Sequence, residues 1–157
     1  MALDIRGCGT ALVTPFAKDG SLDVDALRRL VEFQLKEGIY FLVPCGTTGE
    51  TPTLEHEEYL GVLRVVVEQV ARKVPVIAGV GGNSTKKVCA LAAEVESLGV
   101  AGILSVAPYY NKPTQEGLYQ HFAAVADATK LPVILYNVPG RTSSNIEPAT
   151  VERLAQI

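Results

Sequence analysis

The sequence lacks the marks of a membrane-spanning, exported or nucleic-acid-binding protein. No apolar run approaches the roughly 20 residues that a helix needs to cross a bilayer. The first residues, Met1 to Arg6, lack the long apolar stretch of a secretion signal, so we expect a cytoplasmic location and no membrane partner. Basic residues are scattered and the formal charge is −3, which gives no electrostatic reason for a nucleic-acid partner.

Cysteine is also scarce. The three cysteines, Cys8, Cys45 and Cys89, are far apart and odd in number. This pattern argues against a disulfide framework and against a Cys-x-x-Cys metal site. We predict no metal and no cofactor.

The composition is that of a folded protein. Of the 157 residues, 48% are hydrophobic and 20% are charged, which argues against disorder. Because a domain usually has about 100–200 residues, we predict a single domain over residues 1–157.

Short β-branched runs alternate with amphipathic segments along the whole sequence. Strands are predicted at residues 10–14, 40–44, 75–79, 102–106 and 131–136, and helices at 23–37, 54–73, 84–98, 114–129 and from 148 onward. Thr53 and Ser84 are the expected caps of the second and third helices. The strands begin about 30 residues apart, which is the size of one β-α unit. Near-continuous apolar strands are typical of a parallel sheet covered by helices on both faces.

Two α/β architectures accept five such units. One is a doubly wound five-stranded sheet. The other is a (β/α)8 TIM barrel of which about five β-α units are present, because a whole barrel needs eight units and about 250 residues. Chemistry-bearing side chains follow the second, fourth and fifth strands alike, which favours the barrel.

Two glycine-containing loops are candidate ligand-binding sites. Residues 46–50, Gly-Thr-Thr-Gly-Glu, offer hydroxyls and backbone N–H groups suited to a carboxylate or a phosphate, although an ordinary βα turn remains an alternative. The loop lacks the lysine of a nucleotide-binding P-loop. Residues 79–84 imitate a dinucleotide fingerprint, but Ser84 stands at its third glycine position, so we interpret them as a tight turn.

Tyrosines and one arginine follow the later strands. Tyr109 and Tyr110 lie in the loop after the fourth strand, and Tyr136 ends the fifth. A tyrosine held between polar groups can relay protons. The alternative is a structural role, with a packed ring and a solvent-exposed hydroxyl. Arg141 could bind a carboxylate in a bidentate pair or lie free on the surface.

Other reactive side chains have simpler interpretations. His56 and His121 lie on predicted helices, away from strand ends, and are interpreted as solvated or structural. Cys45 adjoins the threonine loop, but no base stands near it in the sequence, so we interpret it as a packing residue.

Taken together, the loops at residues 46–50, 108–113 and 136–142 resemble those of the dihydrodipicolinate synthase (4-hydroxy-tetrahydrodipicolinate synthase) family. This family belongs to the pyruvate-dependent class I aldolases, which include N-acetylneuraminate lyase. The similarity runs in order along the whole chain, and residues 9–16 and 78–83 contribute to it.

The resemblance implies a fold, a reaction and an assembly. The fold would be a (β/α)8 barrel followed by a small helical region, and the assembly a homotetramer built as a dimer of dimers. The lyase would condense pyruvate with L-aspartate 4-semialdehyde through a lysine Schiff base, on the route to diaminopimelate and lysine.

The resemblance also implies roles for five residues. Thr47 and Thr48 would hold the pyruvate carboxylate, and Thr47 would also help proton transfer. Tyr136 would be the acid and base at the Schiff base. Tyr110 would complete the relay across a dimer interface, and Arg141 would bind the carboxylate of the semialdehyde.

The sequence departs from the family pattern in two ways. The family's Schiff-base lysine lies on the sixth strand, beyond Ile157, and none of the seven lysines present looks buried enough to replace it. We therefore expect the N-terminal five-eighths of a synthase, inactive by itself. Lys87 stands where members inhibited by lysine carry a glutamate, so tight feedback is not expected.

Two rival functions stay open. The chain could be a non-catalytic five-stranded α/β module that binds a small carboxylate through Thr47, Thr48 and Arg141. It could also belong to a sister pyruvate aldolase, such as N-acetylneuraminate lyase, that uses another aldehyde.

Overall fold

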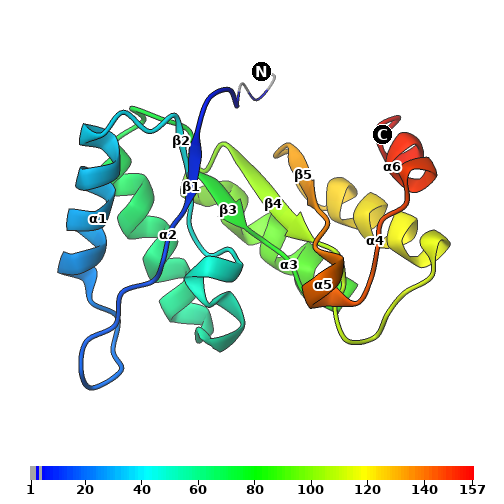
Figure 1. Cartoon of the computed structure of the whole chain (residues 1–157), viewed down its shortest axis with the longest axis horizontal. Coiled ribbons are helices and arrows are strands. Elements are labelled where there is room, and N and C mark those ends of the chain that lie inside the picture. Colours follow the sequence, from blue (N-terminus) through cyan, green and yellow to red (C-terminus); the bar gives the residue numbers. More distant parts are fainter. Residues whose placement is uncertain (1–2, 4) are drawn as a thin grey trace. The chain divides into compact units, whose positions relative to one another are not determined.

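Figure 1 shows the computed structural model of the chain, which describes residue 3 and residues 5–157. The chain divides into two compact units. Unit 1 comprises the described residues up to Gly79 together with Leu98–Gly102, and unit 2 comprises Val80–Ser97 and Ile103–Ile157. Because two compact units can belong to one domain, the single domain expected over residues 1–157 stays a prediction.

Parallel strands form the centre of unit 1. Strand β1 (Gly9–Ala11) pairs in parallel with β2 (Phe41–Val43). Leu42 also forms a parallel bridge to Val76, directly before the fully buried β3 (Ile77–Gly79). The parallel arrangement predicted from the apolar runs is therefore found in this unit.

Two helices of unit 1 pack against each other. These are α1 (Val24–Lys36) and α2 (His56–Val70), drawn in blue and green in Figure 1. The Asp23 carboxylate accepts a hydrogen bond from the backbone N–H of Ala26 at 2.8 Å, which caps α1. The most deeply buried α1 side chains, four residues apart, are Leu27 and Val31, as expected for one apolar face.

The start of α2 differs from the prediction. Glu55, and not Thr53, is the N-cap, and it forms a capping box with Glu58. Thr53 is unavailable because its hydroxyl donates to the carbonyl of Glu50 at 2.8 Å within a short 3-10 turn. The helix ends at Val70, three residues before the predicted end.

Unit 2 repeats the alternation of strands and helices. Its longer elements are α3 (Thr85–Val95), β4 (Gly102–Val106, of which Gly102 belongs to unit 1), α4 (Gln115–Asp127), β5 (Val133–Tyr136) and α6 (Pro148–Leu154). Strands β4 and β5 are parallel and in register from Ile103 opposite Val133 to Val106 opposite Tyr136. Helix α4 packs against both α3 and α6.

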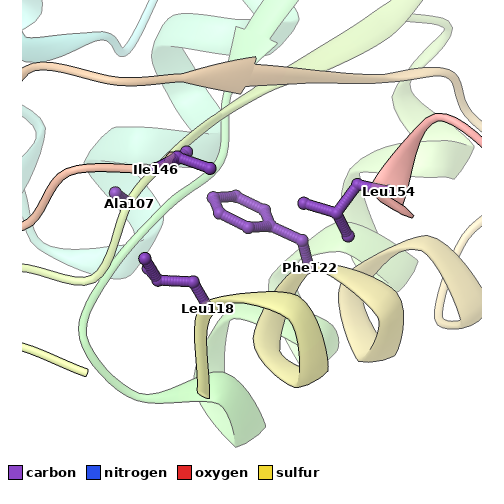
Figure 2. Close-up of a cluster of buried hydrophobic side chains, with 5 residues drawn as sticks. All are labelled: Ala107, Leu118, Phe122, Ile146 and Leu154. Carbon is purple, nitrogen blue, oxygen red and sulfur yellow. The ribbon is translucent and has the colours of Figure 1, made fainter. Parts of the chain in front are cut away.

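A buried apolar cluster in unit 2 fixes the segment that follows β5. Figure 2 shows the Phe122 ring of α4 surrounded by Ala107, Leu118, Ile146 and Leu154. Burying such a phenylalanine side chain contributes about 1.5–3 kcal/mol. Because Ile146 lies between β5 and α6, the cluster anchors the chain just beyond Arg141.

Several short elements were not predicted. Among the described residues these include the 3-10 turns η1 (Thr47–Gly49), η2 (Thr51–Thr53) and η3 (Glu96–Leu98), together with the one-turn helix α5 (Pro139–Thr142). Strand β1 (Gly9–Ala11) is three residues long and shares only Thr10 and Ala11 with the strand predicted at residues 10–14. Among the described residues, no helix combines the length and the hydropathy that a bilayer span requires.

Candidate active site

The threonine loop of unit 1 forms a compact turn directly after β2. Cys45 and Glu50, with φ angles of 55° and 56°, flank the 3-10 turn η1 in the left-handed region. The hydrogen bonds of η1 use the N–H groups of Gly49 and Glu50, which donate to the carbonyls of Gly46 and Thr47 at 3.0 and 3.2 Å. A helical turn leaves its first N–H groups without partners inside the turn, so those of Thr47 and Thr48 suit an anion.

Two buried or half-buried threonine hydroxyls form hydrogen bonds to the backbone of this turn. The Thr14 hydroxyl donates to the carbonyl of Gly49 at 2.7 Å, and Thr14 is only 5% exposed. The Thr51 hydroxyl donates to the carbonyl of Gly46 at 3.0 Å and also contacts that of Cys45. The two ends of the turn are thereby fixed, while the side chains of Thr47 and Thr48 remain exposed.

Close backbone packing adds to this support. A Cβ atom on Gly79 would collide with the backbone carbonyl of Cys45, so only glycine fits at this place in β3. The Tyr59 hydroxyl donates to the Gly79 carbonyl at 3.1 Å. Burial raises the pKa of the Cys45 thiol to about 12, which agrees with its interpretation as a packing residue.

The tyrosine loop of unit 2 holds Tyr110 out toward solvent. Tyr110 is 89% exposed and has a φ angle of 73°, which is strained for a residue with a large side chain. The Asn111 amide group donates to the carbonyl of Asn83 at 3.0 Å, and the Asn111 N–H donates to the Tyr109 carbonyl at 2.9 Å. The backbone beside Tyr110 is therefore fixed, although the ring is not packed.

The last residues of β5 and the helix α5 present the other two candidates. Tyr136 is half-buried, and its carbonyl accepts a hydrogen bond from the N–H of Ala107 at 3.0 Å. Arg141 is exposed on α5. Pro139 begins this helix, where its fixed φ and missing N–H cost nothing.

A network of polar side chains supports the Arg141 loop. The Thr142 hydroxyl, beside Arg141, donates to the carbonyl of Ser144 at 2.9 Å. The Asn137 amide bonds the side chain of Asn145 at 2.9 Å and accepts from the N–H of Ile146 at 3.1 Å. These bonds close residues 137–146, which include Arg141, into a compact loop.

The five predicted residues divide between the two units. Thr47 and Thr48 lie in unit 1, and Tyr110, Tyr136 and Arg141 lie in unit 2. Within unit 2, the loops that bear Tyr110 and Arg141 are joined by a hydrogen bond from the Ser144 hydroxyl to the Pro108 carbonyl at 3.0 Å. The supporting residues Thr14 and Ser144 were not predicted from the sequence, because their hydrogen-bond partners lie 35 and 36 residues away.

The lysine and histidine side chains differ in their solvent exposure. All seven lysines of the chain are exposed: Lys18, Lys36, Lys73, Lys86, Lys87, Lys112 and Lys130. His56 is exposed, whereas His121 is 3% exposed and its Nδ1 lies 2.9 Å from the Thr85 hydroxyl. Burial lowers the pKa of His121. His121 is thus structural, which was one of its two predicted roles.

In the part of the chain that the structure describes, no three His, Cys, Asp or Glu side chains gather as a metal site would require.

The comparisons with known proteins agree over nearly the whole chain. Residues 4–157 match the Dihydrodipicolinate synthetase family. The 4-hydroxy-tetrahydrodipicolinate synthase of Koribacter versatilis is 58% identical over 156 residues, which are 99% of this chain and 52% of that protein. The corresponding protein of Geotalea uraniireducens is 57% identical over 151 residues, covering 96% of this chain and 52% of that protein.

Solved structures give the same result. The chloride-inhibited dihydrodipicolinate synthase from Acinetobacter baumannii, complexed with pyruvate, superposes with a TM-score of 0.96 at 47% identity, over 98% of this chain and 53% of that one. Dihydrodipicolinate synthase from Aquifex aeolicus superposes with a TM-score of 0.94 at 45% identity, over 97% of this chain and 52% of that one. The chain spans about half the length of the relatives it matches.

Proposed function

Because the chain belongs to the dihydrodipicolinate synthetase family, we propose that it supplies the carboxylate-binding and proton-relay residues of a pyruvate-dependent lyase. The lyase condenses pyruvate with L-aspartate 4-semialdehyde through a Schiff base to give 4-hydroxy-tetrahydrodipicolinate. The observation that carries this proposal is the 58% identity to a synthase over 156 residues. The three strand-end loops that bear the candidate side chains all lie within the matched residues.

In this proposal the threonine turn binds pyruvate. The first N–H groups of η1 and the exposed hydroxyls of Thr47 and Thr48 offer several donors to one carboxylate. The Thr47 hydroxyl also helps to transfer protons. A relay of hydroxyls is useful here because the carbinolamine that precedes the Schiff base must lose its oxygen as water, which requires a proton donor.

The residues of unit 2 serve the second substrate and the other protons. Tyr136 acts as the acid and base at the Schiff base, and Tyr110 completes the relay across a dimer interface. Arg141, whose planar guanidinium matches a carboxylate, binds the acid group of the semialdehyde. The 89% exposure of Tyr110 supports a ring that reaches a neighbouring subunit, in keeping with a homotetramer made of two dimers.

The nucleophile of this reaction lies outside residues 1–157. A lysine that forms a Schiff base near neutral pH is desolvated, and every lysine of this chain is exposed. We therefore propose that the chain by itself does not condense the substrates and that the lyase is a longer cytoplasmic protein.

The fold proposed for that longer protein is a (β/α)8 barrel, of which this chain provides about five units. An apolar groove lies beside β5, where the next strand of a barrel would pack. It is lined by Phe122, Ala126, Leu131, Val133, Leu135 and Leu154, among others. Such a groove supports further structure covering this part of unit 2.

The experiment uses a chimera in which residues 1–157 replace the matching segment of the Koribacter versatilis relative. We expect pyruvate-dependent consumption of aspartate 4-semialdehyde, and one pyruvate fixed by borohydride on a lysine outside residues 1–157. An adduct on one of the seven lysines of this chain would contradict the assignment. Condensation of another aldehyde in preference to the semialdehyde would favour a sister aldolase.

Two substitutions in the chimera test the carboxylate assignments. Arg141→Ala should lower kcat/KM for the semialdehyde about 10- to 100-fold, because a charge-assisted hydrogen bond is lost. Thr47→Val should lower kcat/KM for pyruvate instead. The matched control is Arg153→Ala, since Arg153 is an exposed arginine of α6 that pairs with Glu116 at 2.9 Å, and it should leave both values unchanged.

A further inference from the structure

The loops that carry Tyr110 and Arg141 share one buried side-chain contact. The Ser144 hydroxyl donates to the Pro108 carbonyl at 3.0 Å, across 36 residues of sequence. Ser144 is only 6% exposed. A buried hydroxyl without its acceptor, or a buried carbonyl without its donor, loses a free energy comparable to a hydrogen bond, so this contact strongly favours one arrangement of the two loops.

The contact lies where the tyrosine loop leaves the sheet. Ala107 still bonds the carbonyl of Tyr136 at 3.0 Å, and Pro108 is the last buried residue before Tyr110. Beyond Tyr110, the next attachment is the Asn111 side chain on the Asn83 carbonyl at 3.0 Å. Tyr110 is therefore held between two attachments, that of Pro108 and that of Asn111.

The ring of Tyr110 depends on these attachments for its position. At 89% exposure the ring is not packed against its own unit. The backbone of Tyr110 has a left-handed φ of 73°, which residues with side chains rarely adopt. A residue keeps such a backbone conformation only when its surroundings enforce it. The hydrogen bonds on either side of Tyr110 supply that constraint.

Ser144 is itself fixed by the loop that carries Arg141. Its N–H donates to the Thr142 hydroxyl at 3.2 Å, and that hydroxyl donates to the Ser144 carbonyl at 2.9 Å. Ser143, with a φ of 55°, turns the chain between them. These local bonds involve the backbone of Ser144, so they survive removal of its hydroxyl.

We propose that Ser144 is a positioning residue for Tyr110, because its buried hydroxyl ties the Arg141 loop to the tyrosine loop at the Pro108 carbonyl. The inference rests on the proposed function, in which Tyr110 passes protons. Removing the hydroxyl releases one side of the tyrosine loop and leaves the Arg141 turn closed. The proton-transfer step should therefore suffer while binding of the semialdehyde carboxylate does not.

The test compares Ser144→Ala with Ser143→Ala in the chimera. Ser143 is the neighbouring exposed serine, so its substitution removes the same atom without the contact. We expect Ser144→Ala to lower kcat about tenfold, since small displacements of reacting groups have effects of this size or larger, and to leave KM for the semialdehyde unchanged. Ser143→Ala should alter neither value.

Hydrogen exchange gives a second readout that does not depend on turnover. In Ser144→Ala, the amides of residues 109–112 should exchange faster, while those of α4 and β4 keep their rates. Asn111→Ala, which releases the other side of the loop, should give the same pattern of exchange.

The outcomes are distinct. An inactive unsubstituted chimera would contradict the proposed function, and the exchange rates would still decide the role of Ser144. Unchanged exchange at residues 109–112, or equal kinetics for the two serine variants, would overturn the inference. A uniform rise in exchange throughout unit 2 would show that Ser144 acts only in general stability and would overturn it as well.

Discussion

Unit 1 and unit 2 both present candidate substrate-binding residues after strands, but they hold them by different means. In unit 1 the threonine turn has hydrogen bonds from Thr14 and Thr51 and, in addition, close backbone packing, in which Gly79 meets the carbonyl of Cys45. In unit 2 the Arg141 loop is held by side-chain hydrogen bonds from Asn137 and Thr142. The turn should therefore be sensitive to added atoms, and the loop to lost polar groups.

The difference fits the ligands proposed for each place. A turn that binds a small carboxylate through its N–H groups must keep its backbone in one conformation, and buried packing gives that rigidity. A loop that presents a long arginine side chain positions it less strictly, because the side chain has several rotatable bonds of its own. Side-chain hydrogen bonds suffice for such a loop.

Among the substitutions that test this comparison, Gly79→Ala is expected to cause the largest loss of stability. The new Cβ would collide with backbone and not with a flexible side chain, so the chimera should lose about 3 kcal/mol or more of stability. Gly140→Ala in the Arg141 loop is the matched control, since no atom lies within 4 Å of its Cβ position and its φ is not left-handed. Urea titration of both variants measures the difference. Equal losses would show that the two places are held in the same way.

A smaller effect is expected from Thr14→Val. This substitution keeps the shape of the side chain but leaves the buried Gly49 carbonyl without its donor, at a cost of about 1–3 kcal/mol. The turn should loosen, so KM for pyruvate should rise while KM for the semialdehyde stays constant. Thr14→Ser retains the hydroxyl and should restore most of the loss. Failure of Thr14→Ser to do so would assign the effect to the methyl group.

The main features of the fold could be predicted from the sequence. Apolar β-branched runs at intervals of about 30 residues predicted parallel strands separated by helices, and such strands are found within each unit. The predicted boundaries were less accurate where a side chain had competing partners. Thr53 looks like a cap, but its hydroxyl is used within η2 by the Glu50 carbonyl.

The candidate residues could be named from loop motifs, whereas their supports could not. Thr47, Tyr110 and Arg141 stand in short loops directly after strands, where local sequence carries the signal. Thr14 and Ser144 act across 35 and 36 residues of sequence, and no local pattern predicts such a contact. The left-handed backbone of Cys45 was equally hidden, because residues with side chains rarely adopt it.

A weaker effect on stability is expected from a change of pH, through His121 of unit 2. Burial lowers the pKa of His121 below its ordinary value of 6.5, so the unfolded chain takes up a proton more readily than the folded one. The resulting stability is present above pH 6.5 and is lost as the pH falls toward the lowered pKa. Urea midpoints measured across this range should fall more steeply for the chimera than for His121→Gln.

The smallest perturbation, and the most direct probe of packing in unit 1, is thiol labelling. Cys8 is exposed, Cys89 is half-buried, and Cys45 is buried with a pKa raised to about 12. Because the thiolate is the reactive form, iodoacetamide in mildly alkaline buffer should modify Cys8 first and Cys45 only on unfolding, as peptide masses would show. Gly79→Ala should bring the labelling of Cys45 close to that of Cys89, because the new methyl group collides with the backbone of Cys45 itself. Continued protection of Cys45 in that variant would mean that the turn has moved as a rigid whole, and that close packing at Gly79 is not what fixes its conformation.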